Sequence, residues 1–359
     1  MPVHYWVGDG FIDMRQLESL ASRGDLQELE RGRGSIEHRG ARVRLESLAA
    51  ASEPFSPIGL GKPLSIRMHS IYVGKLPGYF KKDVLAVSGV KSVETFETAA
   101  RAVNLIQSGV ADHEFAEFSA FRQNSPIVYY STAVTNYDLV ASVEVIPDTF
   151  KEETVQKVSG LFGMAAGLPV FAPAGTYLLA GSCLMKIFSD LGRVFFQKGP
   201  ILSHTLKLNF GVAGLPLFRE GFYIVSNESS LSAFEGYSPQ IVNGSVKLGK
   251  GSRVYDGDIP YVILGVDGRQ EPALEGFRPQ LASAAVLEKF YPKEDGFNVL
   301  IDELGEAMRL YSDLSFRTKA EDVRKRLSRM KESDPDYARL NELFEAYRKN
   351  ITQEELKLT

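Results

Sequence analysis

The residue types that most often perform acid–base or metal chemistry are few in this chain. The histidines are His4, His38, His69, His113 and His204, and none stands at H-E-x-x-H or another metal-ligand spacing. The single cysteine, Cys183, lies among apolar residues, which is typical of an inert buried thiol and excludes an internal disulfide. We therefore expect neither a metal ion nor a cofactor, and we interpret each histidine first as structural.

Sequence motifs for nucleophilic catalysis and phosphate binding are missing as well. The chain has no G-x-S-x-G nucleophile elbow and no G-x-x-x-x-G-K-[ST] phosphate loop. Catalytic partners can be far apart in sequence, so a hydrolase or transferase with dispersed residues stays open as a third hypothesis. A pocket that gathers His69, His113 or His204 with carboxylates would support it.

Three aspartates flank one predicted strand, IPYVILGV. Asp256 and Asp258 precede it and Asp267 follows it. Calcium prefers several such oxygens converging at loop ends. The arrangement is similar to that of lipid-binding β-sandwiches of the C2 type, but it does not match an EF-hand loop. Solvated turn aspartates are the plainer interpretation.

The longest stretch without a charged residue runs from Val158 to Met185. Its length would suit a membrane span, but glycines and prolines interrupt it, so it predicts a helical hairpin at about 149–197. Thr149 and Glu152 form a capping box that starts the first helix. The hairpin is either permanent core or a sheltered element that leaves the core and inserts into a membrane. Its candidate membrane or partner contacts are Leu161, Phe162, Gly163, Gly167, Val170, Phe171, Leu178 and Leu179.

A second candidate contact surface is basic. Arg324, Lys325, Arg326 and Arg329 fall within one predicted helix near the C-terminus. A solvated helix face is the plain interpretation, and contact with anionic lipid is the functional one. Because no aromatic residues are interleaved and the net charge is −4, we expect no nucleic-acid partner.

The order of predicted elements indicates an α+β protein. Short runs rich in Val, Ile, Tyr and Phe predict strands from Leu64 onward, and they resume after the hairpin, which makes the hairpin an insertion. The last third is helical, with a helix at 299–314, another begun by the capping box Thr318–Glu321, and a final helix capped at Asp334-Pro335. The expected domains are a partly flexible arm (1–62), a β-sandwich-like domain with the hairpin insertion (63–275) and helices packed on it (276–359).

We therefore expect a non-enzymatic interaction or effector protein, membrane-active or pore-forming through the hairpin. A soluble protein-binding adaptor is the alternative. A hydrophobic content of 44% and a charged content of 24% are those of a globular protein. The first residues do not resemble a signal peptide, so we expect a cytoplasmic protein that associates with a membrane after activation. A protein partner is expected first, and an anionic membrane second.

Overall fold

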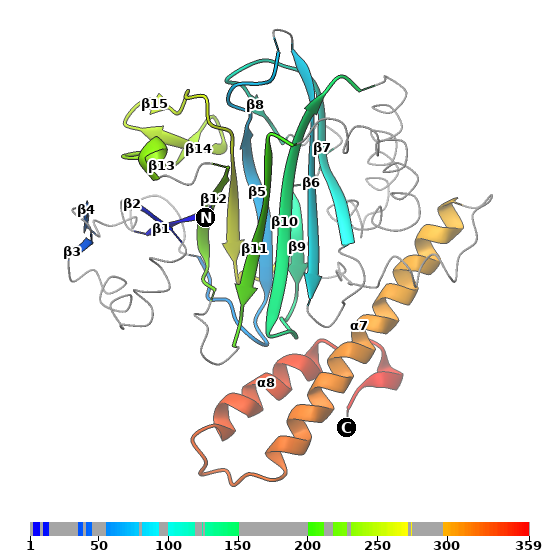
Figure 1. Ribbon diagram of the computed structural model, residues 1–359. Coiled ribbons are helices and arrows are strands. Elements are labelled where there is room, and N and C mark those ends of the chain that lie inside the picture. The colour runs from blue at the N-terminus through cyan, green and yellow to red at the C-terminus, as the bar shows by residue number, and fades with distance from the viewer. Residues whose placement is uncertain are drawn as a thin grey trace.

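The chain forms antiparallel sheets followed by a pair of helices (Figure 1). The computed structural model describes residues 3–7, 10–13, 35–38, 41–44, 55–78, 81–92, 100–118, 124, 126–150, 200–211, 218–227, 231–271, 274 and 297–358. The predicted sheet-rich architecture is confirmed. The predicted hairpin at about 149–197 lies almost entirely outside the described residues.

The larger sheet has seven strands in the order β2-β1-β12-β16-β5-β8, and β9 also pairs with β5. Its strands are β1 (Val3–Val7), β2 (Gly10–Asp13), β5 (Leu64–Tyr72), β8 (Phe115–Ala116), β9 (Ile127–Ser131), β12 (Gly221–Ser226) and β16 (Tyr261–Asp267). Every pairing in it is antiparallel. Strands β1 and β2 come from the region that the sequence assigned to an N-terminal arm, and β1 pairs directly with β12.

A four-stranded sheet, ordered β11-β10-β6-β7, covers one face of the larger sheet. Its strands are β6 (Lys82–Ser92), β7 (Ala100–Val110), β10 (Asp138–Asp148) and β11 (Leu202–Asn209). In β10 every second residue from Leu139 to Val145 is buried, as expected for a strand with one face on a core. The main core lies between the two sheets, so the described strands form a β-sandwich-like architecture.

A small three-stranded sheet and a short 3-10 helix cover part of the opposite face (Figure 1). They are β13 (Ser238–Val242), β14 (Ser245–Lys250), β15 (Arg253–Val254) and η2 (Leu231–Phe234), and a separate pair joins β3 (Ser35–His38) to β4 (Ala41–Arg44). Because β16 is covered on both faces, its first six residues are all buried. Asn243 and Gly244 form the turn between β13 and β14, with φ angles of 52° and 80° that suit a tight hairpin.

Four register shifts interrupt the described sheets, and two of them insert His69 and Asn104. In β5, Met68 pairs with Leu264 and Ser70 with Ile263, so His69 is an extra residue. In β7, Asn104 is extra in the same way, and its buried side chain donates a hydrogen bond of 2.9 Å to the carbonyl of Ile127. β7 is therefore a bulged strand.

One end of the outer edge of β11 is closed by a side chain. The amide nitrogen of Asn227 donates to the carbonyl of Ile201, and its oxygen accepts a hydrogen bond of 3.3 Å from the backbone N–H of Ser203. Asn227 follows β12, which belongs to the other sheet. Its amide therefore links the two sheets at their border.

The C-terminal residues form helices α7 (Phe297–Leu327) and α8 (Tyr337–Lys349) and the short 3-10 helix η4 (Glu354–Leu356). The predicted helix start at Thr318 is wrong, because α7 continues through it and the Thr318 hydroxyl donates to the carbonyl of Leu314 instead. Helix α8 begins at Tyr337, two residues later than the predicted start at Pro335. Leu340 and Tyr347 are buried on the inner side of α8.

Candidate functional site

The basic surface predicted from the sequence lies at the end of α7 and in the turn that follows. Arg324, Lys325, Arg326, Arg329 and Lys331, here called the basic tip, are all exposed. Residues 324–331 contain no acidic side chain. Figure 1 shows the turn between α7 and α8 at the end of the molecule remote from the sheets.

The apolar residues of α7 explain why the basic tip faces solvent. Ala320, Val323 and Leu327 follow one another at helical spacing and pack into the core between α7 and α8. Residues 324–326 therefore occupy the remaining part of the helix surface. Met330 continues the apolar contact beyond the helix end, which leaves Arg329 and Lys331 on the outside.

Acidic neighbours, including exposed Glu332 directly after Lys331, offset part of the charge of the basic tip. Asp322 lies 3.7 Å from Lys325, and an exposed pair of this kind contributes little. Asp334 accepts a hydrogen bond from the backbone N–H of Asp336, and Asp336 in turn pairs with Arg339 at 3.1 Å. These two carboxylates hold the turn and the first residues of α8. The cations at the C-terminal end of α7 also match the negative end of its helix dipole.

A buried carboxylate fixes the end of the chain on this pair of helices. Asp313, which is fully buried, accepts hydrogen bonds from the Thr352 backbone N–H (3.0 Å), the Thr352 hydroxyl (2.8 Å) and the Gln353 backbone N–H (2.8 Å). Ile351 and Leu358 pack into the same core. Residues 310–358, here called the C-terminal helical unit, therefore have a core of their own.

The histidines in the part of the chain with described side chains lie apart. His69 is in β5, His204 is in β11 of the other sheet, and His113 is in the turn after β7. Only His113 is bonded to a carboxylate, with its Nε2 2.8 Å from Asp258 Oδ1, and this hydrogen bond lowers the pKa of Asp258. Burial lowers the pKa of His69 to about 4, so its ring is neutral at pH 7. Among described residues these histidines do not meet in one pocket.

The aspartates that flank β16 do not converge either. Asp258 precedes the strand and Asp267 ends it, so the strand separates them by about 20 Å. Asp267 accepts hydrogen bonds from the backbone N–H groups of Ser56 (2.8 Å) and Arg269 (3.0 Å). Within the ranges that the structure describes, no three His, Cys, Asp or Glu side chains could hold a metal ion together.

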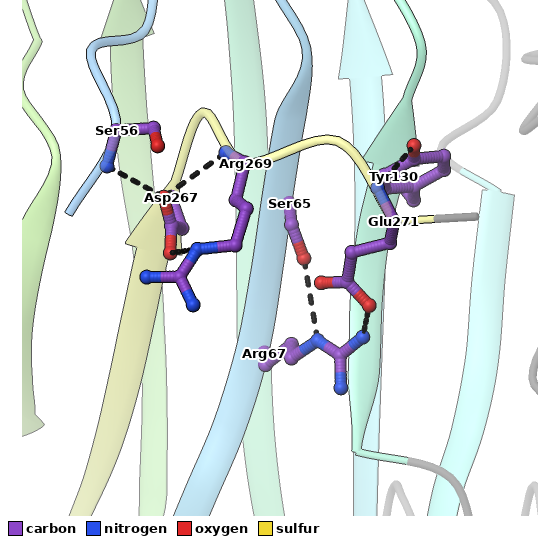
Figure 2. Close-up of polar contacts among 7 residues, drawn as sticks. All are labelled: Ser56, Ser65, Arg67, Tyr130, Asp267, Arg269 and Glu271. Atoms are coloured by element: carbon purple, nitrogen blue, oxygen red, sulfur yellow. Dashed lines mark hydrogen bonds and ion pairs between the residues drawn. The ribbon is translucent and has the colours of Figure 1, made fainter. Parts of the chain in front are cut away.

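A polar cluster that the sequence did not reveal surrounds the end of β16 (Figure 2). Arg67, on the outer face of β5, forms an ion pair with Glu271. The backbone N–H of Glu271 donates a hydrogen bond of 3.2 Å to the hydroxyl of Tyr130. The Arg67 Nε also donates to the Ser65 hydroxyl at 3.4 Å. Burial lowers the pKa of Arg67, and the charge of Asp267 opposes that shift.

The charges of this cluster balance within the protein. Arg67 is matched by Glu271, and Arg269 lies 3.6 Å from Asp267. The cluster therefore ties the segment after β16 to the sheet, and its charges do not point to a ligand. Arg67 is the one residue of β5 with a permanent charge, and this signal could not name a partner 204 residues away.

The predicted hairpin contacts, from Leu161 to Leu179, lie outside the described residues, as does Cys183. In the part of the chain that the structure describes, none of the helices has an apolar stretch long enough to cross a membrane. The sequence matches no protein-family model, and a comparison with curated proteins finds none that matches it.

Proposed function

We propose that the protein is a non-enzymatic interaction protein that binds an anionic membrane surface through its basic tip. One observation carries the proposal: five exposed cations, unbroken by acidic residues, stand at the end of a helical pair remote from the sheets. A Lys or Arg close to an anionic membrane contributes about 1 kcal/mol of binding free energy. Five such residues give reversible binding that weakens as salt is added.

The shape of the basic tip favours a membrane surface over a shaped pocket in a partner protein. Arg324, Lys325 and Arg326 are consecutive, so they point in different directions around the helix instead of forming one stripe. The apolar residues between the cations, Leu327 and Met330, pack inward. The surface therefore offers diffuse charge without an exposed apolar anchor, as suits a layer of anionic headgroups.

Vesicle co-sedimentation tests the proposal. The full chain is mixed with phosphatidylcholine vesicles that either contain or lack phosphatidylserine. The test variant carries Arg324→Gln, Arg326→Gln and Arg329→Gln. A matched control carries Lys75→Gln, Lys81→Gln and Lys207→Gln, three exposed cations of the sandwich. We expect the test variant to bind phosphatidylserine vesicles about 100-fold more weakly, and the control to bind nearly as the wild type does.

Two results would overturn the proposal. If the wild-type chain does not bind phosphatidylserine vesicles at low salt, the basic tip is not a membrane contact. A soluble adaptor that binds a protein partner then becomes the better explanation. If both triple variants weaken binding equally, net charge and not the basic tip controls association.

The proposal extends to the apolar stretch 158–185 on the strength of its sequence alone. Docking through the basic tip would bring the chain to a bilayer into which Leu161, Phe162, Val170 and Phe171 insert. Dye leakage from phosphatidylserine vesicles tests this step. Leakage that disappears in a Phe162→Asp/Phe171→Asp variant that still co-sediments would support insertion, and binding without leakage by the wild type would limit the function to surface docking.

A further inference from the structure

We infer that residues Phe55–Lys62, here called the strap, hold the C-terminal helical unit against the sandwich, and that displacing the strap releases the unit. This inference concerns how the helical pair is held and does not depend on what the basic tip binds. Within the described residues, the segment after β16 and helix α8 both contact these eight residues.

The first end of the strap joins the segment that leaves β16. The Ser56 backbone N–H donates to Asp267 Oδ1 at 2.8 Å, and the Ser56 carbonyl accepts a hydrogen bond of 2.9 Å from the N–H of Gly268 (Figure 2 draws the first). A β-carbon added to Gly268 would come within 2.1 Å of the Pro57 carbonyl oxygen. The two segments are thus in direct backbone contact.

The other end of the strap receives helix α8. A β-carbon on Gly61 would lie 2.7 Å from Leu343 Cδ1 and 3.2 Å from Ala346 Cβ, so α8 packs directly on the strap backbone. Gly61 also has a φ of 73°, a conformation that other residues adopt with strain. This position therefore favours glycine for two separate reasons.

One carbonyl connects the strap, the sandwich and α8. The carbonyl of Val134 accepts a hydrogen bond of 2.9 Å from the N–H of Gly61 and one of 3.3 Å from the Tyr347 hydroxyl. The N–H of Val134 donates a hydrogen bond of 2.9 Å to the carbonyl of Lys62. Losing the strap would therefore also disturb the acceptor that binds Tyr347.

Within the described residues, few other buried side chains join the helical unit to the sandwich. Ala133 is the one sandwich residue among the fully buried members of its core, as far as the described residues show. The remaining members, including Phe316, Val323, Leu340 and Tyr347, belong to the unit itself. Because the unit keeps its own core when it separates, undocking exposes little apolar surface. Movement as one body is thus easier than unfolding.

Spin-label distances in the full chain test the inference. In a Cys183→Ser background, labels on Lys207→Cys in β11 and Lys331→Cys in the turn before α8 report the distance between sandwich and helical unit. We expect one narrow distance distribution for this protein. Gly61→Val should broaden it and add longer distances, because the new side chain meets Ala346.

Matched variants separate the strap from general strain. Gly78→Val is the control for Gly61→Val, because Gly78 also has a positive φ of 96° but nothing within 4 Å of an added β-carbon. Asp267→Ala acts at the far end of the strap and should broaden the distribution too. Asp256→Ala, at the opposite end of β16, should not. Tyr347→Phe, the mildest change, should add a small population at longer distances.

The outcomes are decisive in both directions. The inference is supported if Gly61→Val and Asp267→Ala broaden the distance distribution while the two control variants, Gly78→Val and Asp256→Ala, leave it unchanged. If Gly61→Val leaves the distribution narrow, or if Gly78→Val broadens it equally, the inference is wrong. If Gly61→Val does not fold, Asp267→Ala and Tyr347→Phe still decide, because an unchanged distribution in both would show that the strap does not hold the unit.

Discussion

The imidazole of His69 occupies the space above Gly265, where a β-carbon would come within 2.3 Å of His69 Nε2. Phe222, which pairs with Gly265 across β12 and β16, meets the imidazole edge-on with ring centroids 5.4 Å apart. The bulge in β5 and the missing side chain in β16 therefore act together. The first adds the histidine to the outer face of the sheet, and the second leaves room for its ring.

Replacing Gly265 by alanine should force this ring away. We expect Gly265→Ala to lower the free energy of unfolding by about 1–3 kcal/mol, as overpacking of a filled site does. Urea denaturation measures the change. The double variant His69→Ala/Gly265→Ala provides the control, because alanine at 265 should cost much less once the ring is gone. An equal cost in both backgrounds would show that the contact is not responsible.

His69 should also make stability depend on pH. Burial, together with the charge of Arg67, lowers its pKa from 6.5 to about 4. Between these values the unfolded chain binds a proton that the folded chain does not, so stability is full above pH 6.5 and falls as the pH drops towards 4. The loss attributable to His69 is about 3 kcal/mol. Burial lowers the pKa of His204 as well, which adds a loss of the same sign.

Urea denaturation at several pH values between 8 and 4 measures this dependence. We expect His69→Gln to show a clearly shallower fall than the wild type, and His204→Gln a smaller change. If the stability of His69→Gln falls with pH as steeply as that of the wild type, His69 is not the cause of the pH dependence.

The pair Lys247–Glu117 should respond unequally to the loss of either partner. The Lys247 side chain is only 11% exposed, and its ammonium lies 2.9 Å from Glu117 Oε1 and 4.2 Å from the centroid of Phe115. Glu117 is 53% exposed. Glu117→Gln leaves a nearly buried charge without its partner, whereas Lys247→Met leaves a carboxylate that water can solvate. Thermal denaturation should therefore show a larger loss for Glu117→Gln, and the reverse order would contradict this account.

Asp313 should be required for docking of the last residues. Asp313→Ala removes the acceptor of three hydrogen bonds from Thr352 and Gln353, so we expect a loss of about 2–3 kcal/mol. Trypsin should then cleave after Lys349 sooner than in the wild type. Asp322→Ala, an exposed carboxylate on the same helix, should change neither stability nor cleavage.

Strand positions could be predicted from the sequence because apolar alternation and turn residues act locally. The runs beginning at Leu64, Asp138 and Glu220 contain strands β5, β10 and β12. Thr318 shows the limit of local patterns. A capping-box spacing occurs inside a helix whose apolar residues, from Phe316 to Val323, continue to pack without a break.

In the candidate site, too, local features could be predicted from the sequence and long-range contacts could not. The basic tip could be predicted, because five cations within eight residues are visible in the sequence. The partners of Arg67 and of Gly61 could not, because each depends on a segment more than 200 residues away that only the fold brings near. A glycine in a linker gives no sign that a helix will pack on it.

Asn227 has a consequence for how the protein behaves at high concentration. The outer strand of a sheet presents unpaired N–H and C=O groups that can recruit a strand from another molecule, and this is a common start of aggregation. At the start of β11, the Asn227 amide already occupies the carbonyl of Ile201, just before the strand, and the N–H of Ser203. Exposed Lys207 places a charge farther along the same strand. The Asn227 side chain thus helps to prevent the edge of the sandwich from pairing with a strand of another molecule.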